Sequence, residues 1–258
     1  MLLKDKVALI VGGSESIGRV ISTRFAEEGS LTAICSRHRP QPPQLIEELG
    51  ARGLEAMWAP ADMLDSKAMV ACVEQVVDHY GKLDILIVSG SPTTCPANLF
   101  ELTDPANFLP IMESQIISRF NCLHAALKPM IAAGYGKVVF LATDAGRTPT
   151  PGTSIGGAAT AGLFYFARAA GRELACKGIR VNCIGVPLTA DTESWERYKT
   201  GDILSPVHMK AYAKAEAATP FRMTVPGDLA DAALFLAGRQ SDQISGAVIS
   251  VNGGLSFP

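Results

Sequence analysis

The chain has little net charge and no long hydrophobic run. Its 23 Lys and Arg against 25 Asp and Glu give a formal charge of -2, which leaves no basic field to attract nucleic acid or an anionic membrane. No apolar run approaches the roughly 20 residues that span a bilayer, and Met1–Lys6 lead straight into a strand without a signal peptide. We therefore expect a cytoplasmic protein that binds neither nucleic acid nor a membrane.

Cysteines at redox or metal-ligand spacing are also absent. The chain has no C-x-x-C pair and no histidines near its cysteines at metal-ligand spacing. The six cysteines are scattered along the chain: Cys35, Cys72, Cys95, Cys122, Cys176 and Cys183. We expect all of them to be reduced thiols packed in the core, and we expect no metal site.

The chain does contain a regular alternation of apolar strands and amphipathic helices. Val7–Val11 is a short continuous apolar run, typical of a central parallel strand, and apolar residues then recur at helical spacing from Ile17 until Gly29. Further strands are predicted at Leu31–Cys35, Glu55–Ala59, Asp84–Val88, Lys137–Thr143, Arg180–Val186 and Ala247–Val251, and further helices at Leu45–Gly50, Ser66–Gly81, Pro105–Ala133, Ser154–Lys177 and Pro226–Gly238. This order predicts one α/β domain over residues 1–258, with a doubly wound parallel sheet of seven strands and a lid-like insertion at residues 191–218.

A glycine-rich turn joins the first strand to the first helix. It reads Gly12-Gly13-Ser14-Glu15-Ser16-Ile17-Gly18. Backbone amides and a helix N-terminus at such a turn are suited to a pyrophosphate. Two interpretations stay open, retained dinucleotide binding and a vestigial turn that only packs the helix on the strand.

Longer motifs in the second half resemble the short-chain dehydrogenase/reductase superfamily. The stretches GKVVFLATDAG and TSIGGAATAGLFYFARAAGRELACKGIRVN lie within residues 136–182 and are similar to the active-site half of that family. The terminal Val251-Asn252-Gly253-Gly254 is close to the family's V-D-G-G, and the resemblance covers essentially the whole chain. It implies a Rossmann-type fold, oxidoreductase ancestry and NAD or NADP as the cofactor.

The resemblance also implies a set of cofactor-binding residues. In the family's T-G-x-x-x-G-x-G turn the middle glycine is Ser16 here, and Asp62 matches the family aspartate that contacts adenine. The residues expected at the cofactor are Gly12, Ser14, Ser16, Ile17, Gly18, Arg37, Asp62 and Met63. Arg37 favours the 2′-phosphate of NADP or is a solvated loop arginine, whereas Glu15 would repel that phosphate, so the cofactor preference stays open.

By contrast, the family's catalytic residues are missing. The positions of its Asn, Ser, Tyr and Lys are occupied here by Gln115, Thr143, Gly156 and Thr160. A tyrosine of ordinary pKa near 10 needs a neighbouring lysine to act as the proton carrier, and Gly156 and Thr160 supply neither group. Loss of general acid catalysis typically slows a reaction roughly 100- to 10,000-fold.

No other residue is a good substitute for the missing tyrosine. Tyr165 lies nine positions after Gly156, which places it on the opposite face of the same helix. Tyr135 and Lys137 belong to the wrong end of their strand. The remaining candidates are the lone histidines His124 and His208, which we interpret as structural or solvated, and Asp144, which carries a different chemistry.

We therefore expect a non-catalytic subunit of a heteromeric NAD(P)-dependent short-chain alcohol dehydrogenase. Family habit implies assembly, either with itself or with a catalytically active paralogue in a heterotetramer. The chain is similar to the inactive subunits of the two-component benzylsuccinate-pathway dehydrogenases, which act on an acyl-CoA intermediate of anaerobic toluene degradation. Two alternatives stay open, an oxidoreductase with altered catalytic residues that uses Thr143, and a dinucleotide-binding sensor.

Overall fold

The computed structural model describes residues 1–37, 42–91, 98–202 and 205–256. Its strands are β1 (Val7–Val11), β2 (Leu31–Cys35), β3 (Ala56–Trp58), β4 (Ile85–Val88), β5 (Gly136–Thr143), β6 (Ile179–Val186) and β7 (Val248–Ser250). They form one seven-stranded sheet in the order β3-β2-β1-β4-β5-β6-β7, and every pair is parallel. The predicted doubly wound sheet is confirmed. Because β1 pairs with both β2 and β4, the winding reverses between β1 and β4, where ligands bind in such sheets.

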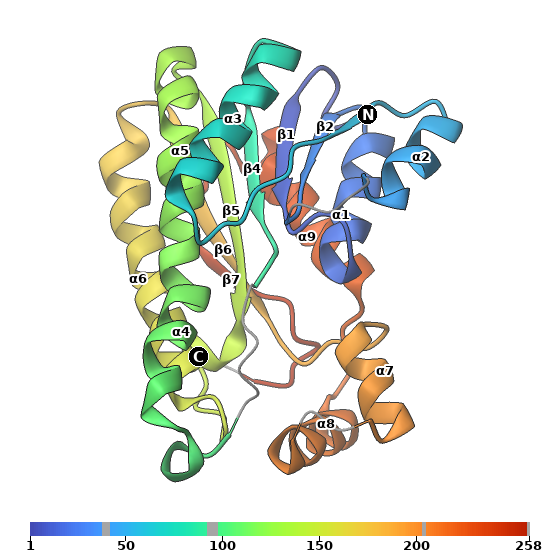
Figure 1. The fold of residues 1–258 in the computed structure, drawn as a ribbon, viewed down its shortest axis with the longest axis vertical. Helices are drawn as coiled ribbons and strands as arrows, with labels where there is room; N and C mark the ends of the chain where they lie inside the picture. The colour runs from blue at the N-terminus through green and yellow to red at the C-terminus, as the bar shows by residue number, and fades with distance from the viewer. Residues whose placement is uncertain (38–41, 92–97, 203–204, 257–258) are drawn as a thin grey trace.

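Helices cover both faces of this sheet (Figure 1). They are α1 (Ser16–Glu27), α2 (Gln44–Ala51), α3 (Ser66–Tyr80), α4 (Phe108–Met112), α5 (Ser118–Ala133), α6 (Ser154–Ala175), α7 (Glu193–Thr200), α8 (Pro206–Ala218) and α9 (Pro226–Ala237). Helices α3, α5 and α6 pack on one face, and α1 and α9 pack on the other. Helices α7 and α8 fall in the predicted insertion and stand apart as a pair (Figure 1). Among the described helices, none is both long and apolar enough to cross a membrane.

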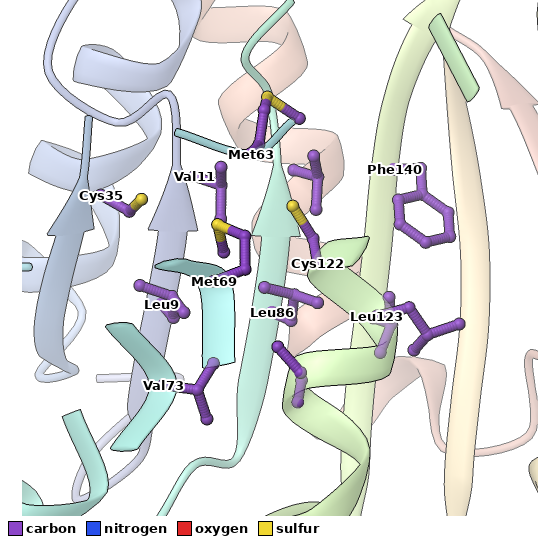
Figure 2. Packing of buried hydrophobic residues seen from close by; sticks show 14 of the residues in the cluster. Leu9, Val11, Cys35, Met63, Met69, Val73, Leu86, Cys122, Leu123 and Phe140 are labelled. Carbon is purple, nitrogen blue, oxygen red and sulfur yellow. The ribbon is translucent and has the colours of Figure 1, made fainter. Parts of the chain in front are cut away.

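The core lies between the sheet and these two helical layers. Figure 2 shows Leu9, Leu86 and Phe140 of neighbouring strands packed with side chains of α3 and α5. Four cysteines lie in this interior, as predicted: Cys35, Cys72, Cys122 and Cys183. The prediction is wrong for Cys176, which is exposed because it occupies the C-cap at the end of α6. The sixth, Cys95, lies outside the described residues.

The predicted single helix over residues 105–133 is helical but not one regular helix. A 3₁₀ turn at Pro105–Asn107 leads into α4, and a π-helical turn at Glu113–Ile117 separates α4 from α5. The Ser114 carbonyl accepts hydrogen bonds from the Ser118 hydroxyl at 2.7 Å and from the Arg119 guanidinium. These side-chain donors support the carbonyl where the helical repeat widens. Hydrophobic periodicity does not report such a turn, because both helix types keep one apolar face.

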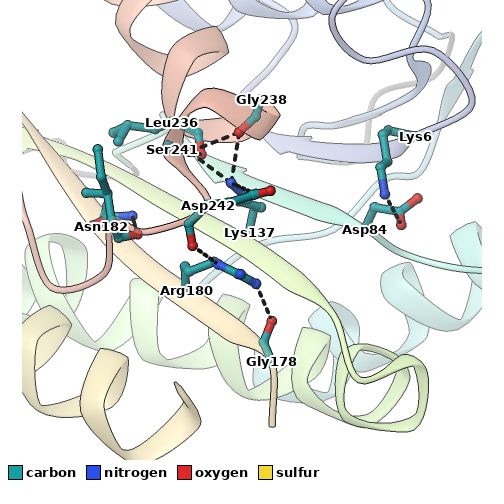
Figure 3. A network of polar contacts seen from close by, with 11 residues as sticks. Lys6, Asp84, Lys137, Gly178, Arg180, Asn182, Leu236, Gly238, Ser241 and Asp242 are labelled. Carbon is teal, nitrogen blue, oxygen red and sulfur yellow. Dashed lines mark hydrogen bonds and ion pairs between the residues drawn. The ribbon is translucent and has the colours of Figure 1, made fainter. Parts of the chain in front are cut away.

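A buried polar network closes the amino-terminal end of the sheet (Figure 3). Lys137, at 1% exposure, donates from Nζ to the Gly238 carbonyl at 2.8 Å and to Ser241 Oγ at 2.9 Å. It also forms an ion pair with Asp242 at 2.8 Å. Burial lowers the pKa of Lys137, and the Asp242 carboxylate opposes this shift. The ammonium group thus meets three acceptors, so Lys137 joins β5 to the end of α9 and is a structural residue.

We expect Lys137→Met to lower the free energy of unfolding by about 2–3 kcal/mol, because it removes two buried hydrogen bonds of the ammonium and its ion pair with Asp242. Chemical denaturation measures this. Lys82→Met is the matched control, since Lys82 is 44% exposed where it pairs with Asp84 and should lose less than about 1 kcal/mol. Equal losses in the two variants would contradict the structural role of Lys137.

Candidate functional site

A cleft of about 570 Å³ opens at the carboxyl ends of β1 and β4. It is lined by the turn after β1, by the ends of β2 and β3, and by Ser89–Ser91 after β4. Every residue predicted to contact a cofactor lies in this lining: Gly12, Ser14, Ser16, Ile17, Gly18, Arg37, Asp62 and Met63. The sequence therefore located the cleft. Binding of a cofactor by these residues stays a prediction.

The turn after β1 depends on two glycines. Gly12 has φ +77°, and a Cβ there would lie 2.4 Å from the Cα of Gly90 beyond β4. A Cβ on Gly18 would lie 1.9 Å from the carbonyl oxygen of Gly12. The turn thus closes on itself and on the end of β4 at distances that a side chain would prevent. The amides of the first turn of α1 have no intrahelical acceptor and lie at this cleft.

Ser16, at the family's middle glycine position, keeps a glycine-like backbone. Its φ of +49° lies in the left-handed region, although it carries a side chain. That conformation costs a non-glycine residue roughly 1–2 kcal/mol. The serine side chain therefore replaces a glycine without the backbone relaxing, and it narrows the approach to the turn.

We expect Ser16→Gly to raise the free energy of unfolding by about 0.5 kcal/mol, because relief of the left-handed strain exceeds the entropy cost of glycine. Ser154→Gly is the matched control, since Ser154 also begins a helix but has no positive φ. It should lose about 0.5 kcal/mol. Denaturant titration of both variants compares the signs, and two losses of equal size would show that Ser16 is not strained.

The far end of the cleft holds the residues that the resemblance assigns to the adenosine. Ser36 Oγ accepts a hydrogen bond from Trp58 Nε1 at 3.0 Å, and Asp62 Oδ1 accepts from the Leu64 amide at 2.9 Å. Asn121 of α5 donates to the Met63 carbonyl at 3.1 Å. These bonds fix the loops that follow β2 and β3, so the Asp62 carboxylate has a defined place in the lining.

At the end of β5 the structure brings the replaced catalytic positions together. Added to Gly156, a Cβ would meet only Ile111 at 3.9 Å and the Gln115 side chain at 4.0 Å. Thr143 Oγ1 accepts from the Ala145 amide at 3.3 Å. Thr160 is 0% exposed, and its hydroxyl makes no hydrogen bond to the described residues. Position 156 therefore faces Gln115, as the resemblance implies, but carries no proton donor.

Asp144, the nearest carboxylate in sequence, is turned away from this pocket. It is 7% exposed and accepts from Asn252 Nδ2 at 2.9 Å and from the Ser256 hydroxyl. Its other oxygen would lie 2.8 Å from a Cβ on Gly185 of β6. Asp144 thus fastens the end of β5 to the tail of the chain.

The other substitutes considered from the sequence are also elsewhere. Tyr165 is 71% exposed on the outer face of α6, as its helical angle predicted, and Lys137 lies in the network at the opposite end of β5. His124 is exposed on α5. His208 is half-buried in α8, where burial lowers its pKa.

Sequence reasoning missed a polar contact across the mouth of the cleft. Gln115 Nε2 donates to Ser91 Oγ at 3.0 Å, and Ser91 Oγ lies 3.1 Å from Ser114 Oγ. Behind it, Arg119 is 2% exposed, and burial lowers its pKa to about 10, so it stays charged at neutral pH. Ser91 replaces the last glycine of the family's N-N-A-G. The Ser91 hydroxyl was the only sign of this contact in the sequence, and its partner Gln115 could not be predicted because it lies 24 positions away.

Comparison with known proteins identifies the family. Residues 6–202 match the short chain dehydrogenase family.
The chain belongs to this family. Among curated short-chain dehydrogenases, the 3-oxoacyl-(acyl-carrier-protein) reductase FabG of Chlamydia muridarum is 30% identical over 256 residues, 99% of each chain. An uncharacterized oxidoreductase of Mycobacterium tuberculosis is 31% identical over 259 residues, covering 99% of this chain and 94% of that one. The crystal structure of a dehydrogenase/reductase from Sinorhizobium meliloti has a TM-score of 0.84 at 26% identity, covering 99% and 96% of the two chains.

Short-chain dehydrogenases typically bind NAD or NADP, and the described residues fit that cofactor at one end only. The Ser14 hydroxyl lines the cleft at 8% residue exposure and makes no hydrogen bond to the described residues, as expected of a group that meets a ligand. Next to Gly156 and Thr160, the described residues offer neither a phenol nor an ammonium. Within the described ranges no group of three or more His, Cys, Asp or Glu side chains is placed to hold a metal.

Proposed function

We propose that this short-chain dehydrogenase is a non-catalytic subunit that assembles with a catalytically competent relative in an NAD(P)-dependent alcohol dehydrogenase. The observation that carries the proposal is Gly156, whose missing side chain faces Gln115 in the pocket at the end of β5. Tyr165 of the same helix does not replace it, since its side chain points outward. The chain keeps the sheet, the turn and the cleft, but not the group that carries the proton.

The outer face of α6 favours assembly. Its exposed side chains Ala158, Ala161 and Tyr165 recur at helical spacing and are small or aromatic. The adjacent helical segment adds Ile117 and Ile131, each more than two-fifths exposed. Small side chains permit close approach of another helix, and exposed apolar groups mark contact surfaces. We propose this face as the interface with the partner, which is either an active paralogue in a heterotetramer or a second copy.

The substrate class of the complex follows from two resemblances. The Chlamydia relative is by name a reductase of 3-oxoacyl groups on acyl carrier protein. The similarity to two-component enzymes of anaerobic toluene degradation points to an acyl-CoA alcohol. We propose that the complex acts on an acyl substrate that is bound and turned over by the partner subunit.

Native mass spectrometry of the complex isolated from its own cells tests the assembly. We expect a hetero-oligomer of this chain with a related chain that carries the catalytic Tyr and Lys, and turnover of NAD or NADP only in that complex. A pure homo-oligomer that turns over secondary alcohols by itself would overturn the proposal. If the isolated chain oxidised secondary alcohols and Thr143→Ala lowered that rate, the result would instead support an oxidoreductase with altered catalytic residues.

A pair of matched variants tests the interface. Ala161→Arg places a large charge on the exposed face of α6, and Ala71→Arg makes the same change on the exposed face of α3. We expect the first to weaken association with the partner roughly 30-fold, equivalent to about 2 kcal/mol, and the second to leave it unchanged. Equal effects would show that α6 is not the contact. If the affinity for the partner changed when a nucleotide was bound, the result would support the alternative function of a dinucleotide-binding sensor.

A further inference from the structure

The part of the cleft that the described residues line corresponds to the adenosine diphosphate half of a dinucleotide. Its lining runs from Arg37 and Asp62, past the turn after β1, to Ser91. Neither Thr143 nor Gly156, Thr160 or Gln115 belongs to that lining. Among the described residues, the lining of this cleft therefore stops short of the replaced catalytic positions.

The half that remains is equipped for an adenosine diphosphate. The amides of the first turn of α1 and the Ser14 hydroxyl meet at the place for two phosphates. Ser14 is the second, independent sign of a ligand, because it is more than nine-tenths buried in the lining and lacks a protein partner among the described residues. The Asp62 carboxylate and the Arg37 guanidinium flank the adenosine end of the cleft, where they can accept from and donate to its polar groups.

Among the described side chains at the replaced catalytic positions, few are placed to bind a nicotinamide riboside. The Thr143 hydroxyl accepts from the Ala145 amide, and the Thr160 hydroxyl is sealed from solvent. Asp144 accepts from Asn252 and Ser256 through Oδ2, and its Oδ1 is buried. The riboside hydroxyls and the carboxamide would lose their hydrogen bonds to water without recovering them from these described side chains, which removes the gain from burying that half.

Three hydrogen-bonded side chains also lie where the described lining of the cleft reaches Ser91. Gln115 reaches Ser91, which itself meets Ser114. Gln115 and Ser114 belong to the π turn at Glu113–Ile117, whose Ser114 carbonyl accepts hydrogen bonds from Ser118 and Arg119. We expect a ligand that extends beyond its second phosphate to compete with the Gln115 to Ser91 bond. The net cost of breaking such a bond is about 1 kcal/mol.

We infer that this cleft recognises its ligand through the adenosine diphosphate half alone, so that ADP binds as tightly as NAD or NADH. The inference rests on the proposed function, because it concerns the nucleotide that a subunit without its own hydride chemistry would hold. It specifies that ligand as any adenosine diphosphate. The cleft then distinguishes neither the oxidised from the reduced cofactor nor a dinucleotide from its adenosine diphosphate fragment.

Calorimetric titration of the purified full chain with ADP, ADP-ribose, NAD and NADH tests the inference. We expect the four dissociation constants to agree within about 3-fold. In Arg37→Ala all four should weaken by the same factor, roughly 10-fold, because one contact serves them all. Binding of NAD or NADH more than about 10-fold tighter than ADP would overturn the inference, as would the absence of ADP binding.

These affinities are measured without substrate or partner, so they do not depend on whether the chain is catalytic. Turnover by the isolated chain would contradict the proposed function, while the ratio of the ADP and NAD dissociation constants would still test the inference about the ligand. Conversely, a strong preference for the dinucleotide would end the inference about the ligand, while native mass spectrometry still decides the subunit role. An unequal response to Arg37→Ala, with ADP weakened and NAD unchanged, would show that the nicotinamide half does bind.

Discussion

The variant Gln115→Asn, Thr143→Ser, Gly156→Tyr, Thr160→Lys is expected to oxidise secondary alcohols with NAD or NADP at least about 100-fold faster than the native chain, which should show no rate above background. The structure leaves room at position 156, because the nearest side-chain atoms to a Cβ there are 3.9 and 4.0 Å away. A tyrosine there would project beside position 115, with a lysine one helical turn later on the same face. The lysine would lower the pKa of the phenol, and both groups would give the riboside half new partners.

The same fourfold change with Gly156→Phe in place of Gly156→Tyr is the control. It has nearly the same volume and lacks only the hydroxyl, so it should stay at background in a spectrophotometric assay of NADH or NADPH formation. Calorimetry gives a second readout, since the tyrosine variant should bind NAD more tightly than ADP. Equal rates for the tyrosine and phenylalanine variants, or activity in the native chain, would contradict our account of what this pocket lacks.

Gly18→Ala is expected to destabilise the fold by about 3 kcal/mol and to abolish nucleotide binding. The new Cβ would stand 1.9 Å from the Gly12 carbonyl oxygen, which is backbone and not a side chain that can swing aside. The turn would have to open, and with it the contact between Gly12 and Gly90 beyond β4. Overpacking typically costs about 1–3 kcal/mol. Because the clash at Gly18 is with backbone that cannot swing aside, we expect a cost at the upper end of this range. Thermal unfolding should show a fall in Tm of roughly 6–12 °C for a chain of this length.

Gly50→Ala provides the matched control for that substitution. Gly50 lies inside α2, and a Cβ there would meet nothing within 4 Å. Because alanine forms helices better than glycine, the free energy of unfolding should rise by about 0.5–1 kcal/mol, with nucleotide affinity unchanged. If Gly18→Ala left stability and nucleotide affinity as intact as Gly50→Ala does, the close contact between Gly18 and the Gly12 carbonyl would be contradicted.

Much of the fold was predictable because its signals are local. The strand at Val7–Val11 was predicted with the bounds that it has, and so was Leu31–Cys35. Each is a short apolar run ending in a turn. The other strands and most helices shifted by one or two residues at their ends, where side-chain caps and the last hydrogen bonds decide the boundary. The π turn at Glu113–Ile117 was not predictable, because it is supported by bonds from Ser118 and Arg119 to one carbonyl.

Part of the candidate site was equally accessible. The glycine turn, Asp62 and Arg37 could be placed from their positions after successive strands, since carboxyl ends of neighbouring parallel strands meet at one edge. The outward direction of Tyr165 followed from helical geometry. The hydrogen-bond partners of the polar side chains could not be predicted from the sequence. Asp144 follows Thr143 in sequence yet bonds to Asn252 and Ser256, more than a hundred positions away.

The amino-acid sequence alone determined the order of strands and helices, the glycines of the turn, and the absence of a tyrosine and lysine from the positions where the family carries them. These properties reside in periodicity and residue identity, which no packing can alter. Tertiary structure alone decided that Ser91 lines the cleft, that Gln115 donates to Ser91 and that the Thr160 hydroxyl is buried. Such contacts join residues brought together by several packed elements at once, and their geometry exists only after the sheet and its helices have assembled.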